Sequence, residues 1–390
     1  MHPDSDAIAA LVFSIYTQCP KRSKPARRSN GVAEWTNLAA VVVTSRDGEY
    51  VCASIATGVK ASPDSAVVTA CGGVLHDCHA EILAIRGFNR YLIDECTRLI
   101  HHPNYISPCV NRPNLDDPTR FDIDEHCKIV LLATEIPCGD ASMEQLGAGA
   151  KENWSFTPAV DTMPLRGRSY FSELGAVRTK PGRFDSLPTL SKSCSDKILA
   201  RQYTSLLLTP TSLLISPRHA YISTLLLPSP KLATNRVALE RAFGKTGRSR
   251  AVVLGNPGGE YGHHSFDIAG FTAQFPDSRD VLADEADPKP STISLLYVHN
   301  LNPPAEALAK GIKLGIKRKK PDAAASTVSR RRLLHDVMRV IDTIAGSKKM
   351  DIKSNYLQIK VHDPARVEMK HVVRAALGNW VPTGPDDFCM

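Results

Sequence analysis

Short apolar runs, each bounded by glycine or polar residues, predict strands at several places along the chain. Residues 38–44 and 50–56 are two such runs, and the Asp47-Gly48 pair between them is a favourable hairpin turn. Residues 128–135 form a continuous apolar run, which is typical of a strand that is covered on both faces. Further strands are expected over residues 220–227 and 292–298.

Apolar residues that recur three and four positions apart predict helices between these strands. The first begins near Asp77, whose side chain could cap it. Its core face is expected to hold Ile82, Ile85, Phe88, Leu92 and Cys96. Other helices are expected over residues 194–208, 328–345 and 364–377. The alternation of strand and helix favours an α/β sandwich with helices on the faces of a sheet.

Two polar segments lack any hydrophobic period. Residues 147–193 are rich in Gly, Pro, Ser and charge, so we expect a long irregular connection of a kind that is usually functional. Residues 277–291 are the best candidate for an insertion or a loosely packed linker. The sequence contains no internal repeat, and its length allows two or three domains or one large enzyme domain with insertions.

Several features predict a cytosolic or nuclear protein. No apolar run approaches the roughly 18 residues that a membrane span requires. The chain opens with Asp4 and Asp6 instead of a basic region, so the apolar stretch 8–16 is not typical of a secretory signal. The 10 cysteines include no C-x-x-C pair, which argues against a disulfide framework or a zinc ribbon.

The distribution of basic residues along the chain predicts a polyanionic partner. The composition, 43% hydrophobic and 23% charged, is that of an ordinary globular protein. The 48 basic residues exceed the 40 acidic residues by 8, but residues 310–374 alone hold 17 basic and 6 acidic residues, a local excess of 11. The other 325 residues therefore sum to −3. Such a block favours a polyanion, most commonly nucleic acid, although a solvated basic helix face is the alternative.

Three short motifs, each at a predicted helix start, together suggest a zinc site. They are His79-Ala80-Glu81, Pro137-Cys138-Gly139-Asp140 and Ser193-Cys194-Ser195-Asp196-Lys197. One histidine and two thiolates suit zinc and leave its fourth position for water, whose pKa zinc lowers from about 15.7 to about 7. Glu81 would then carry protons between this water and the substrate. Taken alone, each motif could be a chance occurrence or a buried structural thiol. Cys78, next to His79 on the predicted helix, would point about 100° away.

The same ligand set and glutamate occur in zinc nucleobase deaminases, but there both cysteines usually lie within P-C-x-x-C. Here Cys194 follows Cys138 by 56 residues. With this separation, the chain resembles the tRNA-specific adenosine deaminases, relatives of the adenosine deaminases acting on double-stranded RNA. The motifs that carry the resemblance are Asp77-Cys78-His79-Ala80-Glu81-Ile82, Pro137-Cys138-Gly139-Asp140-Ala141, Ala176-Val177-Arg178-Thr179-Lys180-Pro181-Gly182-Arg183 and Ser193-Cys194-Ser195-Asp196-Lys197-Ile198.

The resemblance implies a cytidine-deaminase-like three-layer α/β/α sandwich, enlarged by loops and a basic helical C-terminal part. It implies one deaminase domain over residues 1–390, with the catalytic motifs within 58–200 and the basic part 310–380 packed on the same domain. The expected reaction is hydrolysis of the amidine C–N bond of adenosine, which yields inosine and ammonia. The expected zinc ligands are His79, Cys138 and Cys194, and the expected catalytic residue is Glu81.

By resemblance, the substrate is adenosine at position 37 of alanine tRNA, in an anticodon loop where the base is cheaply exposed. Because the catalytic motifs begin by about residue 58 and the resemblance continues nearly to residue 380, we expect no separate double-stranded RNA-binding domain within these 390 residues. Lys60, in the segment Gly58-Val59-Lys60, is the candidate substrate contact, although Val59 replaces a more familiar threonine. Two alternatives remain: a deaminase of duplex or messenger RNA, and an inactive RNA-binding or inositol-phosphate-binding module with a relict zinc site. Nothing indicates a membrane or an obligate protein partner.

The resemblance also implies buried inositol hexakisphosphate, a ligand that needs many converging lysine and arginine donors. Lys197 would link it to the active site through Asp77. The runs 317–320 and 330–332 could instead contact tRNA phosphates, so the basic segment would serve two polyanions. The candidate cofactor-binding residues are Arg86, Lys197, Arg201, Arg330, Tyr356, Lys360, Lys370 and Trp380.

Overall fold

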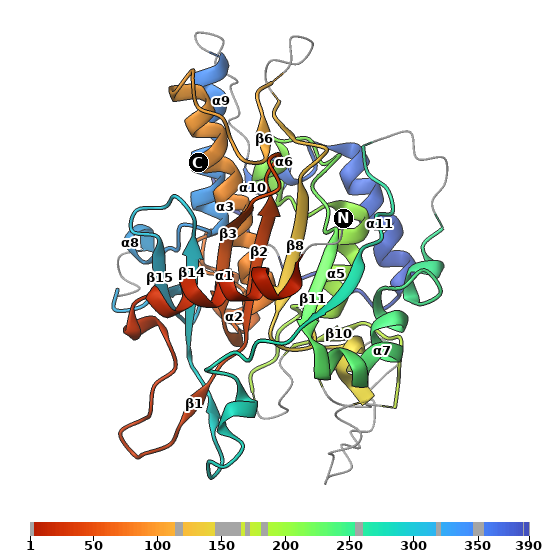
Figure 1. Ribbon diagram of the computed structural model, residues 1–390. Helices are drawn as coiled ribbons and strands as arrows, with labels where there is room; N and C mark the ends of the chain where they lie inside the picture. Colours follow the sequence, from red (N-terminus) through yellow and green to blue (C-terminus); the bar gives the residue numbers. More distant parts are fainter. Residues whose placement is uncertain are drawn as a thin grey trace.

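An eight-stranded mixed sheet forms the centre of the computed structural model (Figure 1), in the order β12-β11-β8-β2-β3-β14-β15-β16. Strands β8, β11 and β12 run parallel, and the other neighbouring pairs are antiparallel. The strands are β2 (Leu38–Thr44), β3 (Tyr50–Thr57), β8 (Lys128–Ala133), β11 (Thr224–Pro228), β12 (Asp267–Phe271), β14 (Ile293–Val298), β15 (Ala305–Ala309) and β16 (Ile312–Lys313). The structure describes residues 4–113, 120–144, 165–167, 172–180, 186–253, 260–316, 321–345, 355–384 and 386–389.

The central strands confirm the predictions from apolar runs. Strands β2 and β3 pair as the expected antiparallel hairpin. Alternate side chains of β8 enter two different apolar cores: Ile129 and Leu131 lie in one, and Val130 and Leu132 lie in the other. Because neighbouring side chains of a strand point to opposite faces, this continuous apolar run requires cover on both sides of the sheet.

Helices supply that cover, and the result is the predicted three-layer sandwich. Helices α3 (Ala80–His101), α5 (Cys194–Thr204) and α7 (Ser229–Phe243) contribute to the core on one face of the sheet. Helix α1 (Ser5–Gln18), which the sequence analysis did not predict, crosses the other face (Figure 1) and packs its buried Ile8, Val12 and Tyr16 against it. The predicted core face of α3 is confirmed, because its five residues are all buried.

The start of α3 differs from the prediction. The helix begins at Ala80, and Asp77 does not cap it. Instead, Asp77–His79 form a short strand, β5, which pairs with β4 (Val59–Ala61). His79 takes the N-cap position, and the Asp77 carboxylate instead accepts hydrogen bonds from Lys180 and Lys197. Cys78 therefore points away from the His79 side because neighbours on a strand alternate, and its thiol lies in the apolar core.

The basic C-terminal part packs against the helices of the sandwich. Helix α9 (Arg330–Ala345) contacts α3, and α11 (Pro364–Leu377) contacts α5. Both agree closely with the predicted helices 328–345 and 364–377. The helix predicted over 194–208 ends earlier, at Thr204, because Ser205 has a left-handed φ of 63°.

The polar segment 277–291 is not a loose linker. Within it, β13 (Lys289–Pro290) pairs with β1 (Glu34–Trp35), and the phenol of Tyr16 donates a 2.5 Å hydrogen bond to Asp277.

The remaining elements are α2 (Asp64–Val67), α6 (Thr209–Ser212), α8 (Pro321–Ala324), α10 (Tyr356–Lys360), β6 (Val110–Asn111), β7 (Asp122–Ile123), β9 (Leu165–Arg166), β10 (Arg178–Thr179), and the 3-10 turns η1 (Lys21–Ser23), η2 (Asp140–Ser142), η3 (Arg248–Ala251) and η4 (Arg279–Leu282). Among the described residues, none of the helices has the length and apolar character that crossing a membrane would demand.

Candidate functional site

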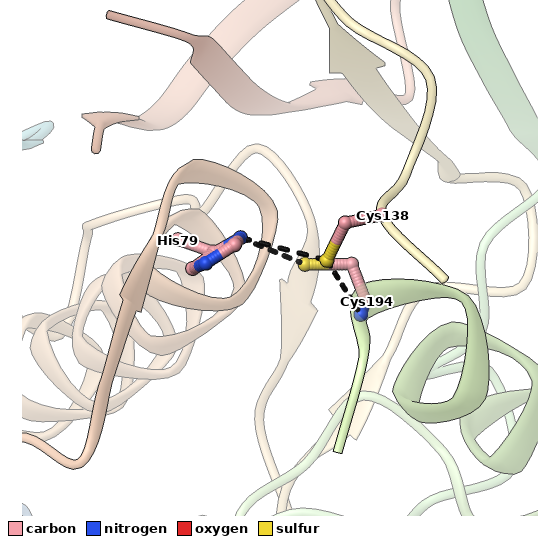
Figure 2. Close-up of side chains that lie close together, drawn as sticks. All are labelled: His79, Cys138 and Cys194. Carbon is pink, nitrogen blue, oxygen red and sulfur yellow. Dashed lines mark hydrogen bonds between the residues drawn. The ribbon is translucent and has the colours of Figure 1, made fainter. Parts of the chain in front are cut away.

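The structure brings His79, Cys138 and Cys194 together from three separate elements (Figure 2). His79 ends β5 and precedes α3, Cys138 lies in the loop after β8, and Cys194 is the first residue of α5. His79 Nδ1 lies 3.6 Å from Cys138 Sγ and 3.7 Å from Cys194 Sγ. All three donor atoms lie within 4.8 Å of one another.

This donor set fits zinc in both chemistry and spacing. Zinc bonds of about 2.0 Å to nitrogen and about 2.3 Å to sulfur, at tetrahedral angles, separate the two donors by about 3.6 Å. The observed nitrogen–sulfur separations of 3.6 and 3.7 Å agree with that value. A set of one imidazole and two thiols can fill three of the four tetrahedral positions of a zinc ion and leave one for water.

The surroundings favour the thiolate form at Cys138, whereas burial and the neighbouring Cys138 raise the pKa of the Cys194 thiol well above its usual range. A hydrogen bond from Cys194, with the nearby charges of Lys180 and His79, holds the pKa of the Cys138 thiol well below its usual range. The backbone N–H of Cys194 also points at Cys138 Sγ, at 3.4 Å. Because that N–H belongs to the first turn of α5, the partial positive charge of the helix N-terminus adds to the effect.

Gly139 allows the two cysteine segments to approach each other. Its φ is +101°, and an added Cβ would lie 2.2 Å from Ser193 Oγ and 2.4 Å from Ser193 Cβ. The segments are joined at this point, because Ser195 N donates to the Cys138 carbonyl at 3.0 Å. A side chain at position 139 would push Cys138 away from Cys194.

Gly139→Ala is therefore expected to lower both zinc content and thermal stability. Left-handed strain costs about 1–3 kcal/mol, and the contact with Ser193 adds to it. The matched control is Gly48→Ala, because Gly48 has a φ of +83° but nothing within 4 Å of its added Cβ. Metal analysis and calorimetry should show zinc loss in the first variant and only a modest melting shift in the second. Equal zinc content in both variants would contradict the expectation.

Glu81 lies in the first turn of α3, two residues beyond His79, and its side chain is buried. Burial, with the charge of Cys138 adding to it, raises the pKa of the Glu81 carboxyl. A buried carboxyl with a raised pKa beside a metal site can both accept and return a proton near neutral pH.

Lys180 belongs to the third motif of the resemblance, but its place in the site was not predicted from the sequence. Its side chain is 3% exposed, and its Nζ donates to both carboxylate oxygens of Asp77, at 2.9 and 2.7 Å. The same Nζ lies 3.4 Å from Cys194 Sγ. Lys197 contacts Asp77 as well, which is the link the sequence analysis expected. Burial alone would raise the pKa of Asp77, but Lys180 and Lys197 hold it well below its usual range.

A cavity of about 500 Å³ begins at this lysine-aspartate chain. It lies between the metal-site side of the sandwich and the basic C-terminal part, and all eight candidate cofactor-binding residues line it. Three further cations, which the sequence analysis missed, line it too: Lys192, Arg366 and Arg374. Among the described lining residues, nine Lys or Arg side chains face two Asp side chains, Asp77 and Asp386.

The cations in this cavity destabilise one another's charges. Burial and the neighbouring cations Arg366 and Lys360 lower the pKa of Lys370 to about 6. Burial and Lys197 lower the pKa of Lys192 to about 8. The Nε atoms of Arg201 and Arg366 are buried without a hydrogen-bond partner among the described residues. A cavity with this charge and these free donors fits a multiply charged anion.

The other predicted contacts, Lys60 and Arg331, are neither among the residues that line the cavity nor among the three grouped donors. Lys60 is exposed on β4, opposite Cys78 in the β4–β5 ladder. Arg331 pairs with Asp322, while the run 317–320 lies outside the described residues, as do Pro181, Gly182 and Arg183 of the third motif. Cys96 and Cys127 are buried, and Cys71 is exposed.

Residues 54–383 match the family model of the adenosine-deaminase (editase) domain. The chain is 34% identical over 385 residues to tRNA-specific adenosine deaminase 1 of Schizosaccharomyces pombe. The aligned region covers 98% of this chain and 95% of that relative. The chain is 39% identical over 215 residues to tRNA-specific adenosine deaminase 1 of Saccharomyces cerevisiae, covering 52% and 53% of the two chains. For the protein of the same name from Drosophila melanogaster, the identity is 34% over 209 residues, 50% and 48% of the two chains.

Proposed function

This chain belongs to the adenosine-deaminase (editase) family and is a hydrolytic deaminase, and we propose that it converts adenosine to inosine at position 37 of alanine tRNA, with zinc as its metal. The observation that carries the proposal is the convergence of His79, Cys138 and Cys194 beside the buried carboxyl of Glu81. The tRNA class is supported by the relatives, whose names describe them as tRNA-specific.

The residues of the site have separable tasks in this hydrolysis. Zinc held by His79 Nδ1 and the two sulfurs would lower the pKa of a water molecule toward neutrality. Glu81 would accept a proton as the water oxygen bonds to the carbon that bears the adenine amino group, and would return it to the ring nitrogen. Glu81 would then take the second proton, from the hydroxyl now bonded to that carbon, and give it to the amino group, so that the C–N bond breaks, ammonia leaves and the hydroxyl oxygen becomes the carbonyl oxygen of inosine. Lys180 would place a positive charge beside the Cys194 sulfur, which opposes the effect of burial in raising the pKa of this thiol.

The choice of tRNA over duplex RNA follows from the cost of exposing the base. The reacting carbon is inaccessible in a stacked duplex, so the base must leave its stack, and unpairing adds to that cost. A base next to an anticodon is already unpaired. The retained Glu81 also favours an active enzyme over a binding module with a relict metal site.

The substrate proposal predicts that inosine forms at one position of one tRNA. Alanine tRNA transcripts with A37 should gain one inosine per molecule, while the same transcript with G37 should gain none. Nucleoside analysis after complete digestion measures both. A duplex RNA of matched adenosine content serves as the third substrate, and faster conversion of the duplex would overturn the proposal in favour of a duplex-RNA editor.

We also propose that the 500 Å³ cavity holds inositol hexakisphosphate. Its nine Lys and Arg side chains and the unpartnered Nε atoms of Arg201 and Arg366 support this assignment. The ligand would contact Lys197, which reaches Lys180 and Cys194 through Asp77. A bound polyphosphate would therefore influence the electrostatics of the metal site without touching it.

A further inference from the structure

A buried charge network joins the two segments that carry the cysteines. Asp140 lies two residues after Cys138 and is 1% exposed, and Asp196 lies two residues after Cys194 and is 0% exposed. Arg248, at the start of η3, places one guanidinium nitrogen 2.6 Å from Asp196 Oδ1 and the other 3.9 Å from Asp140 Oδ2. One arginine thus spans the carboxylates that follow both cysteines.

Arg241, at the end of α7, completes the network on the Cys138 side. Its Nε lies 3.2 Å from both carboxylate oxygens of Asp140, and its NH2 donates to the Asp140 carbonyl at 2.8 Å. The backbone N–H of Gly175 donates to Asp140 Oδ1 at 2.6 Å. Asp140 is therefore held by its side chain and by its main chain at the same time.

Asp196 is fixed in the same manner on the Cys194 side. Its Oδ2 accepts from the Arg178 backbone N–H at 3.0 Å and from Ser193 Oγ at 2.6 Å, while Oδ1 accepts from Arg248. Arg178 precedes Lys180 on the segment that reaches the Cys194 sulfur. The network therefore fixes the relative positions of the three segments that carry Cys138, Cys194 and Lys180.

Such a network is a costly way to stabilise a fold. Burying an ion costs several kcal/mol, and a buried ion pair often stabilises a protein no more than apolar residues of similar volume would. What charged groups add is direction, because hydrogen bonds from Arg248 to Asp196 and from Arg241 to Asp140 fix the orientation of each carboxylate, while the 3.9 Å approach of Arg248 to Asp140 is electrostatic only. The atoms fixed here are two residues from the metal ligands, where small displacements alter the ligand geometry.

We propose that Arg248 and Arg241 are positioning residues for the metal-binding cysteines, acting through Asp196 and Asp140. The segment from α7 to η3 lies outside the metal-binding motifs, yet it completes the ligand geometry. This inference rests on the proposed function only in requiring that the His79–Cys138–Cys194 group bind a thiolate-preferring divalent ion such as zinc.

Metal affinity is the readout that separates positioning from general stability. Arg248→Gln should lower zinc affinity about 10–100-fold in competition with a chromophoric chelator, as is typical when an outer partner of a metal ligand is lost. Cobalt substituted for zinc should give a changed visible spectrum, because its absorption reports ligand geometry. Arg248→Lys should recover part of the affinity. Asp196→Asn combined with Arg248→Gln should be little worse than either change alone.

The matched control is Arg90→Gln. Arg90 also joins two carboxylates, those of Asp94 and Asp336, and its side chain is 13% exposed, but it lies between α3 and α9. This variant should melt at a lower temperature while binding zinc as the wild type does. Unchanged affinity and an unchanged cobalt spectrum in Arg248→Gln would overturn the inference, as would equal losses in Arg90→Gln. Wild-type protein that binds no zinc would overturn the proposed metal centre, and this inference with it.

Discussion

Glu81→Gln is expected to slow inosine formation in alanine tRNA by about 10²–10⁴-fold, the contribution typical of general acid–base catalysis. The amide has nearly the same shape as the carboxyl but cannot accept the proton of the attacking water. Because Glu81 is not one of the three grouped metal donors, the variant should keep its zinc. Single-turnover assays with saturating enzyme measure the chemical step directly, and metal analysis of the same sample verifies the site.

Glu95→Gln provides the matched control on the same helix. Glu95 is fully buried, and it accepts hydrogen bonds from Tyr105, Ser107 and Asn300. Losing part of this network should reduce stability by about 1–3 kcal/mol, with the rate unchanged below the melting transition. If Glu81→Gln retains wild-type turnover, Glu81 is not the proton carrier. If it loses zinc along with activity, its role is structural.

The candidate metal-binding residues could be picked out from the sequence because their chemistry is rare and local, and the structure brings His79, Cys138 and Cys194 together. A histidine, two cysteines and a glutamate, each within a longer motif and in a fixed order, together indicate little besides a metal that activates water. Lys180 and Arg248 carry no comparable motif, because the sequence alone does not distinguish a lysine or arginine that is buried from one that is exposed. What distinguishes them is the partner that the fold brings close, and that pairing spans 103 residues for Lys180 and Asp77.

The helix-start error has a related cause. Asp77 before an apolar periodic segment is a good local cap signal, but the buried Lys180 and the half-buried Lys197, both from elsewhere in the chain, compete for its carboxylate. Taking Asp77 away to cap the helix would leave buried charge unpaired at a cost of about 3–5 kcal/mol, against about 1 kcal/mol for a capping bond, so the segment stays extended and His79 becomes the last residue before the helix. Helix α1 was missed for a simpler reason: its apolar stretch was weighed only as a signal sequence.

The basic residues that line the cavity do not all come from the basic segment near the C-terminus. Five of the nine cavity cations come from the basic segment 310–374, and the other four come from residues 86–201. Net charge therefore overstates the basic surface that is free to contact RNA. The cavity cations are the five residues Arg330, Lys360, Arg366, Lys370 and Arg374, together with Arg86, Lys192, Lys197 and Arg201.

Removal of the proposed polyphosphate should have the largest effect on stability. Denatured, purified protein is expected to release about one inositol hexakisphosphate per chain, detectable by mass spectrometry. A ligand at about 1,000 times its Kd adds about 4.1 kcal/mol, a large share of the roughly 5–15 kcal/mol that stabilises a typical domain. Protein unfolded, desalted and refolded with zinc alone should therefore lack a cooperative melting transition or melt far lower.

Refolding with added inositol hexakisphosphate should restore the melting transition. Inorganic phosphate at the same total concentration of phosphate groups should not. Lys370→Glu should reproduce the loss, because it places a negative charge among the cavity cations. Lys245→Glu, an exposed lysine beyond α7, is the charge-matched control and should refold normally. Full recovery with zinc alone, or folded active protein that releases no polyphosphate, would refute the cofactor assignment.

The pH dependence of folding stability gives a second, independent test of inositol hexakisphosphate as the ligand of the cavity. In the ligand-free cavity, burial and neighbouring cations lower the pKa of Lys370 from its ordinary 10.5 to about 6. Between these values the unfolded chain holds a proton that the folded chain lacks, so stability rises with pH. A bound polyanion favours the ammonium form and removes that slope. Where ligand-free wild type still unfolds cooperatively, its urea midpoints at pH 7 and pH 9 should therefore diverge. They should converge once inositol hexakisphosphate is added, and they should lie closer together in Lys370→Met, where the lowered pKa of Lys192 leaves only a smaller slope. A slope that persists with the ligand present would mean that the anion does not reach Lys370.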